Sequence, residues 1–579
     1  MLAPIKNNFV FFVCMLLLGS LCTVCVLWNG SRMAGLVELW LDLYCLCALL
    51  MLIPAGARGT VRGIISGVLY AIAIIDLGLY YTLGYPIIPQ ILLLTLQTNP
   101  SEAAEAFRTY SDTRLLLTPW ILIFCIIGLH IWAGRRIRRL PDRLFSAKAE
   151  KLISVILVCT LAGALSLTWV DKKYKFRRLV MQQTELELQE SEDLDPRSRF
   201  YLPVYRLADA WCEVRRQKQI YESLKDHISD FKPDSCSHIS PEIVLIIGES
   251  NNRHHSQLYG YDKPTTPHQA EWMERGQLVT FADVVSPWNT TCESLENMLS
   301  LAYYGGQQKW YQQPFITSVM RNCGYEVSLI SNQYVLDKSA SFSDFIEDIF
   351  INIPEVSSRQ FDHRNISLHT YDSDLVTDYD SIASQFSSTY RFTIFHTRNV
   401  HFEFAERYPP SFQRFNGNDY ERSDLNEEQK EILAAYDNAL LYNDHVVNEI
   451  LLRFSGRDAI VIYVPDHGER IFDGDAQYGR SLGFSKGEVR QQHQIPMWFW
   501  ASKEYLDKRP EMWQRIRQAS SERYMTDLLP FTIMTLAGIH STAYCPQYDI
   551  LSSEYDSTRP RIIRETADYD TIVNGRQPR

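Results

Sequence analysis

The chain has 579 residues, more than one ordinary domain contains, and 46% of them are hydrophobic. Its formal net charge of −11 excludes nucleic acid as the main partner, because binding to a phosphate backbone needs a basic face. Apolar residues dominate roughly the first 170 positions, and the rest has the polar, aromatic-rich composition of a globular domain. The sequence therefore predicts a membrane part followed by a globular part.

Five apolar segments in the first part are each close to the ~20 residues that a helix needs to cross a bilayer. They cover residues 9–28, 35–55, 63–84, 114–133 and 152–170. The first segment lacks the cleavage site of a signal peptide and four more segments follow it, so we expect it to be a transmembrane helix. A buried helical core is the alternative, but it explains the charges of the loops less well.

Lysine and arginine in the short loops predict the orientation of these helices. The loop 134–151 is strongly basic, which favours the cytoplasmic side, whereas the loop around 85–113 is mainly acidic. With five spans, everything after about residue 171 then faces the periplasm of a bacterial inner membrane. The stretch 86–107 is either an amphipathic helix on the outer leaflet or a simple connecting loop.

We expect three regions: a transmembrane domain over 1–171, a charged helical linker over 172–235 and a catalytic domain over 236–579. Seven of the twelve cysteines lie in apolar runs, and the other five cannot all pair within one chain. The sequence therefore requires no disulfide framework.

Short apolar runs alternate with helical stretches beyond residue 236. Four of these runs, 242–250, 325–333, 391–399 and 459–469, are typical of strands that are buried on both faces. The alternation predicts an α/β domain with a mainly parallel central sheet and helices on both faces. In such folds, functional sites lie at the carboxyl ends of the strands.

Polar residues follow two of these strands. Glu249 ends the first strand, and Asp466 and His467 follow the fourth. Each residue alone has an ordinary explanation, such as a solvated strand end or a loop hydrogen bond. Together, two carboxylates and an imidazole suit zinc and leave one coordination position open for catalysis.

Two threonines stand directly before the helical run 292–300. Thr290 with Glu293 fits a capping box, in which the threonine satisfies free N–H groups of the first turn. A threonine hydroxyl at a helix N-terminus can also meet a phosphate, and metal coordination would activate it as a nucleophile. The two interpretations are compatible, since one threonine can cap while the other attacks.

Four segments carry a resemblance to a known family: GESNNRHHSQLYGYDKPTTP (248–267), NTTCESLENMLS (289–300), AAYDNALLYNDHVV (434–447) and VPDHGE (464–469). The globular part resembles the alkaline phosphatase and sulfatase superfamily. The whole chain resembles the bacterial phosphoethanolamine transferases, with features closer to the branch that modifies core heptose than to the lipid A branch. The resemblance implies a zinc enzyme that transfers phosphoethanolamine from phosphatidylethanolamine to lipopolysaccharide.

The same resemblance implies roles for single residues. Glu249, Asp466 and His467 match the zinc ligands, and Thr291 matches the nucleophile that also contacts zinc. The family mechanism implies a phosphoethanolamine–threonine intermediate after diacylglycerol leaves. A sugar hydroxyl or phosphate of the acceptor then attacks that intermediate.

Further positions are matched less closely. His401 stands where the family has a histidine near the phosphate. A second family histidine, about a dozen residues after DHGE, has no equivalent here; His493 is either its replacement or a structural histidine. Thr98 and Glu102 match positions that handle lipid in relatives, and we expect Asn332, at a strand end, to contact substrate.

Three other functions stay open on the sequence alone. A hydrolase of the same fold would use water as the acceptor, although it would not need a membrane part. A transferase could act on a different periplasmic glycan. A non-catalytic membrane scaffold could carry a degenerate enzyme domain, although the intact set of Glu249, Thr291, Asp466 and His467 argues against it.

Overall fold

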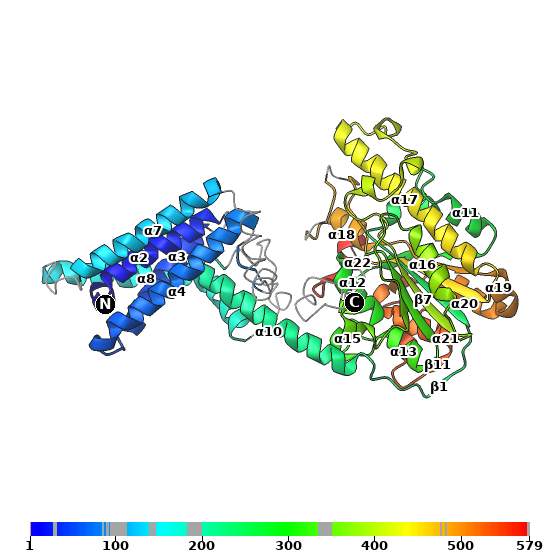
Figure 1. Cartoon of the computed structure of the whole chain (residues 1–579), viewed down its shortest axis with the longest axis horizontal. Coiled ribbons are helices and arrows are strands. Elements are labelled where there is room, and N and C mark those ends of the chain that lie inside the picture. Colours follow the sequence, from blue (N-terminus) through cyan, green and yellow to red (C-terminus); the bar gives the residue numbers. More distant parts are fainter. Residues whose placement is uncertain are drawn as a thin grey trace. The chain divides into compact units, whose positions relative to one another are not determined.

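The computed structural model describes residues 2–26, 32–83, 86–88, 92, 113–137, 146–181, 200–333, 350–474, 477–480 and 483–575. Within them the chain forms two compact units, Met1–Lys218 and Gln219–Arg579, which we describe separately (Figure 1). The division falls inside helix α10 (Pro203–His227), so the region predicted as a linker is shared between the two units.

The N-terminal unit is helical. One long helix covers most of each of the five predicted apolar segments: α2 (Phe9–Cys25), α3 (Arg32–Leu50), α4 (Ala55–Leu83), α7 (Thr113–Arg136) and α8 (Ala147–Leu179), with the short α1 (Ala3–Asn7) in front. Two stretches, Ala55–Tyr81 and Ala147–Leu179, are long and apolar enough to cross a membrane by length and composition. That all five helices do so stays a prediction.

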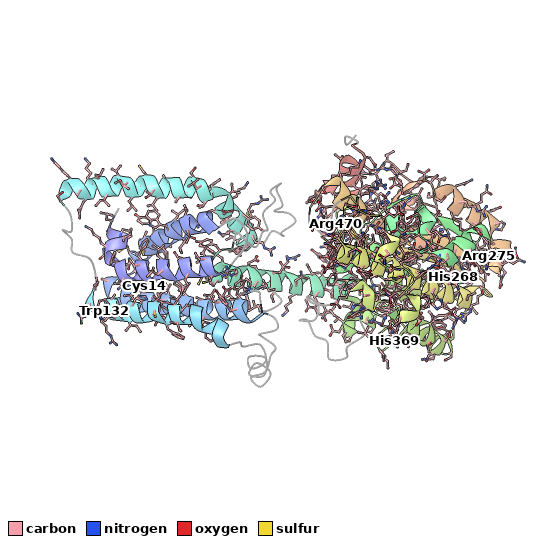
Figure 2. All side chains as sticks on the ribbon, turned by 90° about the horizontal axis from the view of Figure 1, so that it is seen from above. Cys14, Trp132, His268, Arg275, His369 and Arg470 are labelled. Atoms are coloured by element: carbon pink, nitrogen blue, oxygen red, sulfur yellow. The ribbon has the colours of Figure 1, made fainter. Side chains whose placement is uncertain are left out.

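Apolar side chains of this unit lie both inside the bundle and on its outer surface. Cys14 and Leu77 are buried in a common core, whereas Ile64, Trp132 and Leu167 are exposed (Figure 2). Water-soluble domains rarely expose so many large apolar side chains on neighbouring helices, because hydration of apolar surface is unfavourable. The surface is therefore the kind that a lipid environment would cover.

Buried ion pairs hold the last helices of this unit in place. Arg206 on α10 donates from Nε to Asp76 Oδ1 on α4, at 2.9 Å. Lys175 on α8 pairs with the buried Glu38 on α3. Since an unpaired charge in such a place costs several kcal/mol, these pairs fix the positions of the helices.

The C-terminal unit is built on a seven-stranded sheet in the order β3-β9-β8-β2-β7-β5-β6. The strands are β2 (Glu242–Gly248), β3 (Leu278–Thr280), β5 (Glu326–Ser331), β6 (His363–Arg364), β7 (Arg391–His396), β8 (Ala459–Pro465) and β9 (Trp498–Ala501). The strands β2, β5, β6, β7 and β8 are parallel, and β9 pairs antiparallel with both β8 and β3. The four strands expected from the sequence correspond to β2, β5, β7 and β8; the three short strands β3, β6 and β9 were not expected.

Helices cover both faces of this sheet. Along β2, Ile243, Leu245 and Ile247 face one core, whereas Val244 and Ile246 face the other, as the alternation of strand side chains requires. The first face carries α12 (Thr291–Leu299), α13 (Ile316–Asn322), α20 (Pro510–Ala519) and α21 (Leu529–Ala537). The second carries α11 (Pro267–Glu274), α16 (Asp374–Ala383) and α17 (Glu427–Phe454).

Smaller elements complete the unit. The remaining α-helices among the described residues are α15 (Pro354–Ser357), α18 (Lys486–His493), α19 (Lys503–Lys508) and α22 (Tyr569–Asn574). Three two-stranded pairs join β1 (Ser235–Cys236) with β11 (Ile539–His540), β4 (Asp283–Val285) with β10 (Arg523–Met525), and β12 (Ile562–Ile563) with β13 (Ala567–Asp568).

Two of the sequence segments that carry the family resemblance are joined by hydrogen bonds and a buried ion pair. Asp437 on α17 accepts hydrogen bonds from the hydroxyls of Tyr261 and Tyr420 and pairs with His255 Nδ1 at 2.8 Å. Burial lowers the pKa of His255, but Asp437 and Asp473 outweigh it and raise this pKa to about 10. His255 is therefore a cation at neutral pH, and it holds the loop after β2 to α17.

Replacement of Asp437 by alanine is expected to lower the free energy of unfolding of the C-terminal unit by about 3–5 kcal/mol, because a buried cation loses its partner. The pairing contributes fully below the pKa of an unfolded histidine, about 6.5, and is lost as the pH rises through about 10. Denaturant unfolding should therefore show a smaller difference between the wild type and the variant above about pH 10 than at neutral pH. The exposed Asp507→Ala on α19 is the control, and a pH-independent difference would contradict the assignment.

Candidate metal centre

The pairing of β2 with β8 brings the predicted ligands to one edge of the sheet. Gly248 lies opposite Pro465 in the parallel register, so Glu249 and Asp466 leave the sheet side by side. A Cβ atom at Gly248 would lie 2.6 Å from the hydroxyl of Tyr463, so this position requires glycine. The next residue, Ser250, has φ of 55°, and its N–H donates to Asp466 Oδ1 at 3.1 Å. This left-handed turn ties the two strand ends together.

Glu249, Asp466 and His467 form a compact, buried group. One ligand atom from each lies within 4.8 Å of the others, and all three side chains are inaccessible to solvent. His467 Nε2 is 3.5 Å from both Glu249 Oε1 and Asp466 Oδ2. Two ligands that each lie ~2.1 Å from a tetrahedral zinc ion are ~3.4 Å apart. The spacing therefore fits a cation between them better than direct hydrogen bonds.

The hydrogen bonding of the group points to the same conclusion. Asp466 Oδ2 and His467 Nε2 are buried and have no hydrogen-bond partner within the described residues. Burial of an unpaired polar atom costs about 1–3 kcal/mol, so two such atoms facing each other need an explanation. A zinc ion bound by all three side chains supplies one.

His467 is prepared as a ligand. Its Nδ1 donates to the carbonyl of Gly468 at 2.8 Å, which leaves the lone pair on Nε2 towards the carboxylates. Burial lowers the pKa of His467 to about 4, so the ring is neutral at neutral pH, as metal binding requires. Gly468 is essential to this turn, since a Cβ there would lie 2.2 Å from the carbonyl oxygen of Gln491.

Without a bound metal, the pKa values of the two carboxyl groups are shifted in opposite directions. Burial raises the pKa of Glu249, but the electrostatic interactions with His467, which is charged only at low pH, and with Arg480 outweigh this effect and lower it. Burial and the neighbouring Glu249 raise the pKa of Asp466 well above its usual value. Two buried carboxylates in contact cannot both ionise without a nearby cation, which is the situation that a divalent ion relieves.

Thr291 lies beside this group. It is the first residue of α12, and its hydroxyl donates to Glu249 Oε2 at 3.0 Å. Thr290 occupies the N-cap position, but its side chain makes no capping hydrogen bond, and its hydroxyl is buried without a partner in the described part of the chain. The expected capping box with Glu293 is therefore wrong. The helix begins with a backbone bond from Ser294 N–H to the carbonyl of Thr290.

Two further side chains contact Glu249 that the sequence analysis did not identify. Gln333 Nε2 donates to Glu249 Oε2 at 2.7 Å and to the carbonyl of Thr397 at 3.0 Å. Arg480 donates to Glu249 Oε1 at 3.0 Å. Gln333 ends the strand segment 325–333, where strand-end polarity was a usable signal. Arg480 follows His467 by about a dozen residues, where only a histidine was sought.

Asn332 does not face the metal group. Its Nδ2 donates to Asp372 Oδ1 at 2.8 Å, and its Oδ1 accepts from the N–H of His369 at 2.7 Å. Asp372 in turn accepts from the N–H groups of Arg398 and Asn399. The buried amide thus joins the loops after β5 and β7, and a substrate contact of Asn332 stays a prediction.

The two predicted catalytic histidines have different surroundings. His401, after β7, is partly buried, and burial lowers its pKa, with the charge of Glu249 acting in the opposite direction. His493 is fully buried, and its Nδ1 donates to the carbonyl of Ser286 at 2.9 Å. Burial lowers the pKa of His493 to about 3, so this ring stays neutral. The Ser286 hydroxyl donates to the carbonyl of Asp466. His493 therefore contacts the ligand Asp466 indirectly, through Ser286. Thr98 and Glu102 lie outside the described residues.

The chain is similar in sequence to a protein family and to several named proteins. The model of the sulfatase family matches residues 241–539. Phosphoethanolamine transferase EptC of Escherichia coli K12 is 24% identical over 532 residues, which cover 89% of this chain and 87% of that protein. Phosphoethanolamine transferase CptA of Salmonella typhimurium LT2 is 24% identical over 541 residues, which cover 91% and 90%.

A solved structure supports the fold of the C-terminal unit. The crystal structure of the C-terminal periplasmic domain of Escherichia coli EptC in complex with Zn has a TM-score of 0.52 and 26% identity. The match covers 61% of this chain and 98% of that one. The domain with which it aligns was thus solved with the metal that the ligand set here would suit.

Asp466→Asn and His467→Gln are each expected to reduce bound zinc to below about a tenth of the wild-type ratio, because loss of one ligand from a three-residue set weakens binding strongly. Metal content of the purified full chain, measured by inductively coupled plasma mass spectrometry, gives the result. His401→Gln is the control, since His401 is not part of the three-ligand group. Full zinc occupancy in both ligand variants would exclude this site.

Proposed function

Because the chain belongs to the sulfatase family, we propose that it transfers phosphoethanolamine from phosphatidylethanolamine to a lipopolysaccharide acceptor. Two relatives that match about nine tenths of the chain are named phosphoethanolamine transferases. The observation that carries the proposal is the Thr291 hydroxyl, which lies at the start of α12 and 3.0 Å from a carboxylate of the metal group. A hydroxyl in that place is suited to attack phosphorus.

In the first half-reaction the Thr291 oxygen attacks the phosphorus of the donor lipid. A bond forms between this oxygen and phosphorus, the bond to the glycerol oxygen breaks, and diacylglycerol leaves. The Thr291 hydroxyl already donates towards Glu249, so its proton faces an acceptor before the attack. A zinc ion held by Glu249, Asp466 and His467 would supply charge stabilisation and favour the alkoxide.

The chain's own groups complete the first step. The N-terminus of α12, with its positive end of the helix dipole, favours negative charge on the phosphoryl oxygens. The proton that leaves the Thr291 hydroxyl is the one that the departing glycerol oxygen needs, and His401, a partly accessible histidine near Glu249, can carry it from one oxygen to the other. Burial lowers the pKa of His401 and so favours the neutral ring that takes up this proton, and in the second step the same ring can take a proton from the acceptor and return it to the Thr291 oxygen.

In the second half-reaction an oxygen of the acceptor attacks the phosphothreonine. A bond forms between this oxygen and phosphorus, and the bond to Thr291 breaks and restores the hydroxyl. Arg480 is about one-third exposed and contacts Glu249, so it lies at the border between the metal group and solvent. A guanidinium there can bind a phosphoryl oxygen of either substrate.

The N-terminal helices would locate the proposed reaction at the inner membrane. The apolar outer surface of the N-terminal helices supports insertion into the inner membrane as a multi-pass bundle of five helices. The basic loop 134–151 favours a periplasmic catalytic domain. This topology would bring the active site to the leaflet that supplies phosphatidylethanolamine.

Lipopolysaccharide is the acceptor class that we propose, with core heptose ahead of lipid A. One relative, 24% identical over 419 residues, is named Kdo(2)-lipid A phosphoethanolamine 7''-transferase, so this kind of acceptor occurs among similar chains. We place core heptose first because the sequence has features closer to the branch of the family that modifies core heptose than to the lipid A branch. Water or another periplasmic glycan as the acceptor is a separate outcome of the following test.

Thr291→Ala is expected to reduce phosphoethanolamine transfer at least about a hundredfold, because the attacking oxygen is removed while the zinc ligands remain. Mass spectrometry of core and lipid A fragments, from cells that lack the chain and express either form, measures the product. Thr290→Ala is the matched control at the neighbouring position. Transfer by Thr291→Ala at the wild-type rate would refute the nucleophile, and lipid cleavage without modified glycan would indicate a hydrolase.

A further inference from the structure

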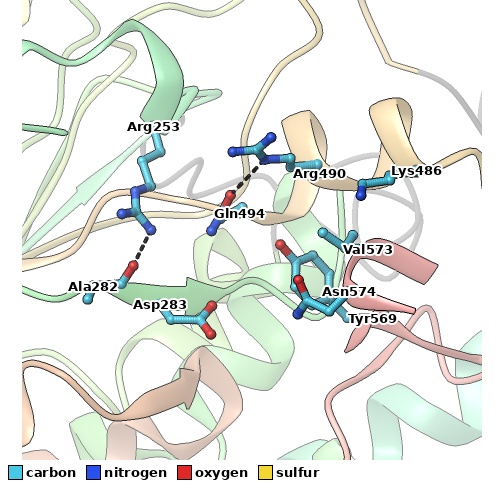
Figure 3. Close-up of a pocket in the computed structure, with 9 residues that line it drawn as sticks. All are labelled: Arg253, Ala282, Asp283, Lys486, Arg490, Gln494, Tyr569, Val573 and Asn574. Carbon is cyan, nitrogen blue, oxygen red and sulfur yellow. Dashed lines mark hydrogen bonds between the residues drawn. The ribbon is translucent and has the colours of Figure 1, made fainter. Parts of the chain in front are cut away.

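A cavity of about 320 Å³ in the C-terminal unit has a basic lining (Figure 3). Arg253 comes from the loop after β2, and Lys486 and Arg490 come from α18. Figure 3 shows these three side chains around one hollow, with Tyr569 and Asn574 of α22 on the facing wall. None of them takes part in the transfer chemistry described above.

The charges of the three cations are not neutralised within the described residues. Asp283 lines the same cavity, but its two carboxylate oxygens accept from Arg561 at 2.7 and 3.0 Å. Arg490 reaches only Gln494, at 3.4 Å. Arg253 donates to the carbonyl of Ala282, and Lys486 makes no ion pair with a described carboxylate. The hollow therefore carries an excess of positive charge.

A buried hydroxyl is a second, independent sign of a ligand. Tyr569 is 1% exposed, and its hydroxyl has no hydrogen-bond partner in the described part of the chain. Figure 3 shows the ring at the wall of the cavity. A buried hydroxyl without a partner costs about 1–3 kcal/mol, and an acceptor oxygen in the cavity would remove that cost.

The elements that line the cavity also adjoin the metal centre, since the N–H of Gly468, next to His467, donates to the carbonyl of Gln492 on α18 at 2.8 Å. Arg253 follows Glu249 by four residues, and Arg490 precedes His493 by three on the same helix. Asp283 begins β4, the strand that leads to Ser286 behind the ligands. A group bound in the cavity would thus have a fixed position relative to the reacting atoms.

We propose that this basic cavity binds a phosphate group of the acceptor glycolipid, while another oxygen of the same acceptor reacts at Thr291. Two guanidinium groups, an ammonium group and a tyrosine hydroxyl match the several oxygens and the double charge of a phosphate monoester. The volume holds a phosphorylated sugar. This inference rests on the proposed transferase function and adds the feature of the acceptor that is recognised.

Transfer kinetics with two acceptors test the inference. Zinc-loaded full-length protein is assayed with lipopolysaccharide that carries core phosphates and with the same material after removal of those phosphates. Lys486→Gln and Arg490→Gln should each raise KM for the phosphorylated acceptor about tenfold, with a much smaller change in kcat. With the dephosphorylated acceptor, the wild type and both variants should have similar KM values.

Lys503→Gln is a closely matched control. Lys486 and Lys503 are each the first residue of a helix that follows a serine N-cap, but only Lys486 lines the cavity. The control should behave as the wild type with both acceptors. A rise of KM in Lys503→Gln equal to that in Lys486→Gln would assign the effect to general surface charge and would overturn the inference.

A binding measurement separates failure of this inference from failure of the proposed function. Calorimetry with phosphorylated core oligosaccharide, with its dephosphorylated form and with inorganic phosphate needs no turnover. Loss of affinity in Arg490→Gln for the phosphorylated oligosaccharide alone supports the cavity as an acceptor subsite, even if the wild type transfers nothing. Equal loss for inorganic phosphate would show a site for free phosphate, and unchanged affinity for every probe would show no anion site; either result overturns the inference.

Discussion

The parallel register of β2 against β8 is the constraint on which the rest of the C-terminal unit depends. Because Gly248 pairs with Pro465, two carboxylates and an imidazole enter a solvent-free space at the same edge of the sheet. Such charges are costly to bury, and the surroundings offset the cost only partly, through Arg480, Gln333 and the N–H of Ser250. A divalent cation would complete the balance, so the same strand register explains both the fold and the suitability of this site for a metal.

A second layer keeps these groups in place. The carbonyl of Ser286 accepts from His493, and its hydroxyl donates to the carbonyl of Asp466. On the other side of the sheet, Asp437 and His255 hold the loop after β2 against α17. Much of the sequence that makes the chain recognisable, including the HHSQLYGYD and YDNALLYND segments, thus positions the site and does not react. Long motifs around a small reactive centre are the expected result when ligand geometry must be kept within a fraction of an ångström.

The sequence was sufficient for the central strands and for Glu249, Asp466 and His467 at their ends, because buried parallel strands leave a strong apolar pattern and polar strand ends stand out against it. It was insufficient for the short strands β3, β6 and β9 and for Arg480, which comes from a loop without periodicity. The capping interpretation of Thr290 failed because the register of α12 directs its hydroxyl into a buried space, which no local pattern reveals. Asn332 and Gln333 are neighbours in sequence, yet only the fold decides which of the two faces the metal group.

The two glycines of the strand ends have a consequence for inhibition. Any side chain at Gly248 would meet the hydroxyl of Tyr463, whose ring is stacked on Trp498. Any side chain at Gly468 would meet the main-chain carbonyl of Gln491. Neither obstacle can move without displacing a buried core or a helix end. A compound that reaches the main-chain atoms of these turns would therefore contact groups that a resistance mutation at Gly248 or Gly468 cannot alter without also displacing the metal ligands.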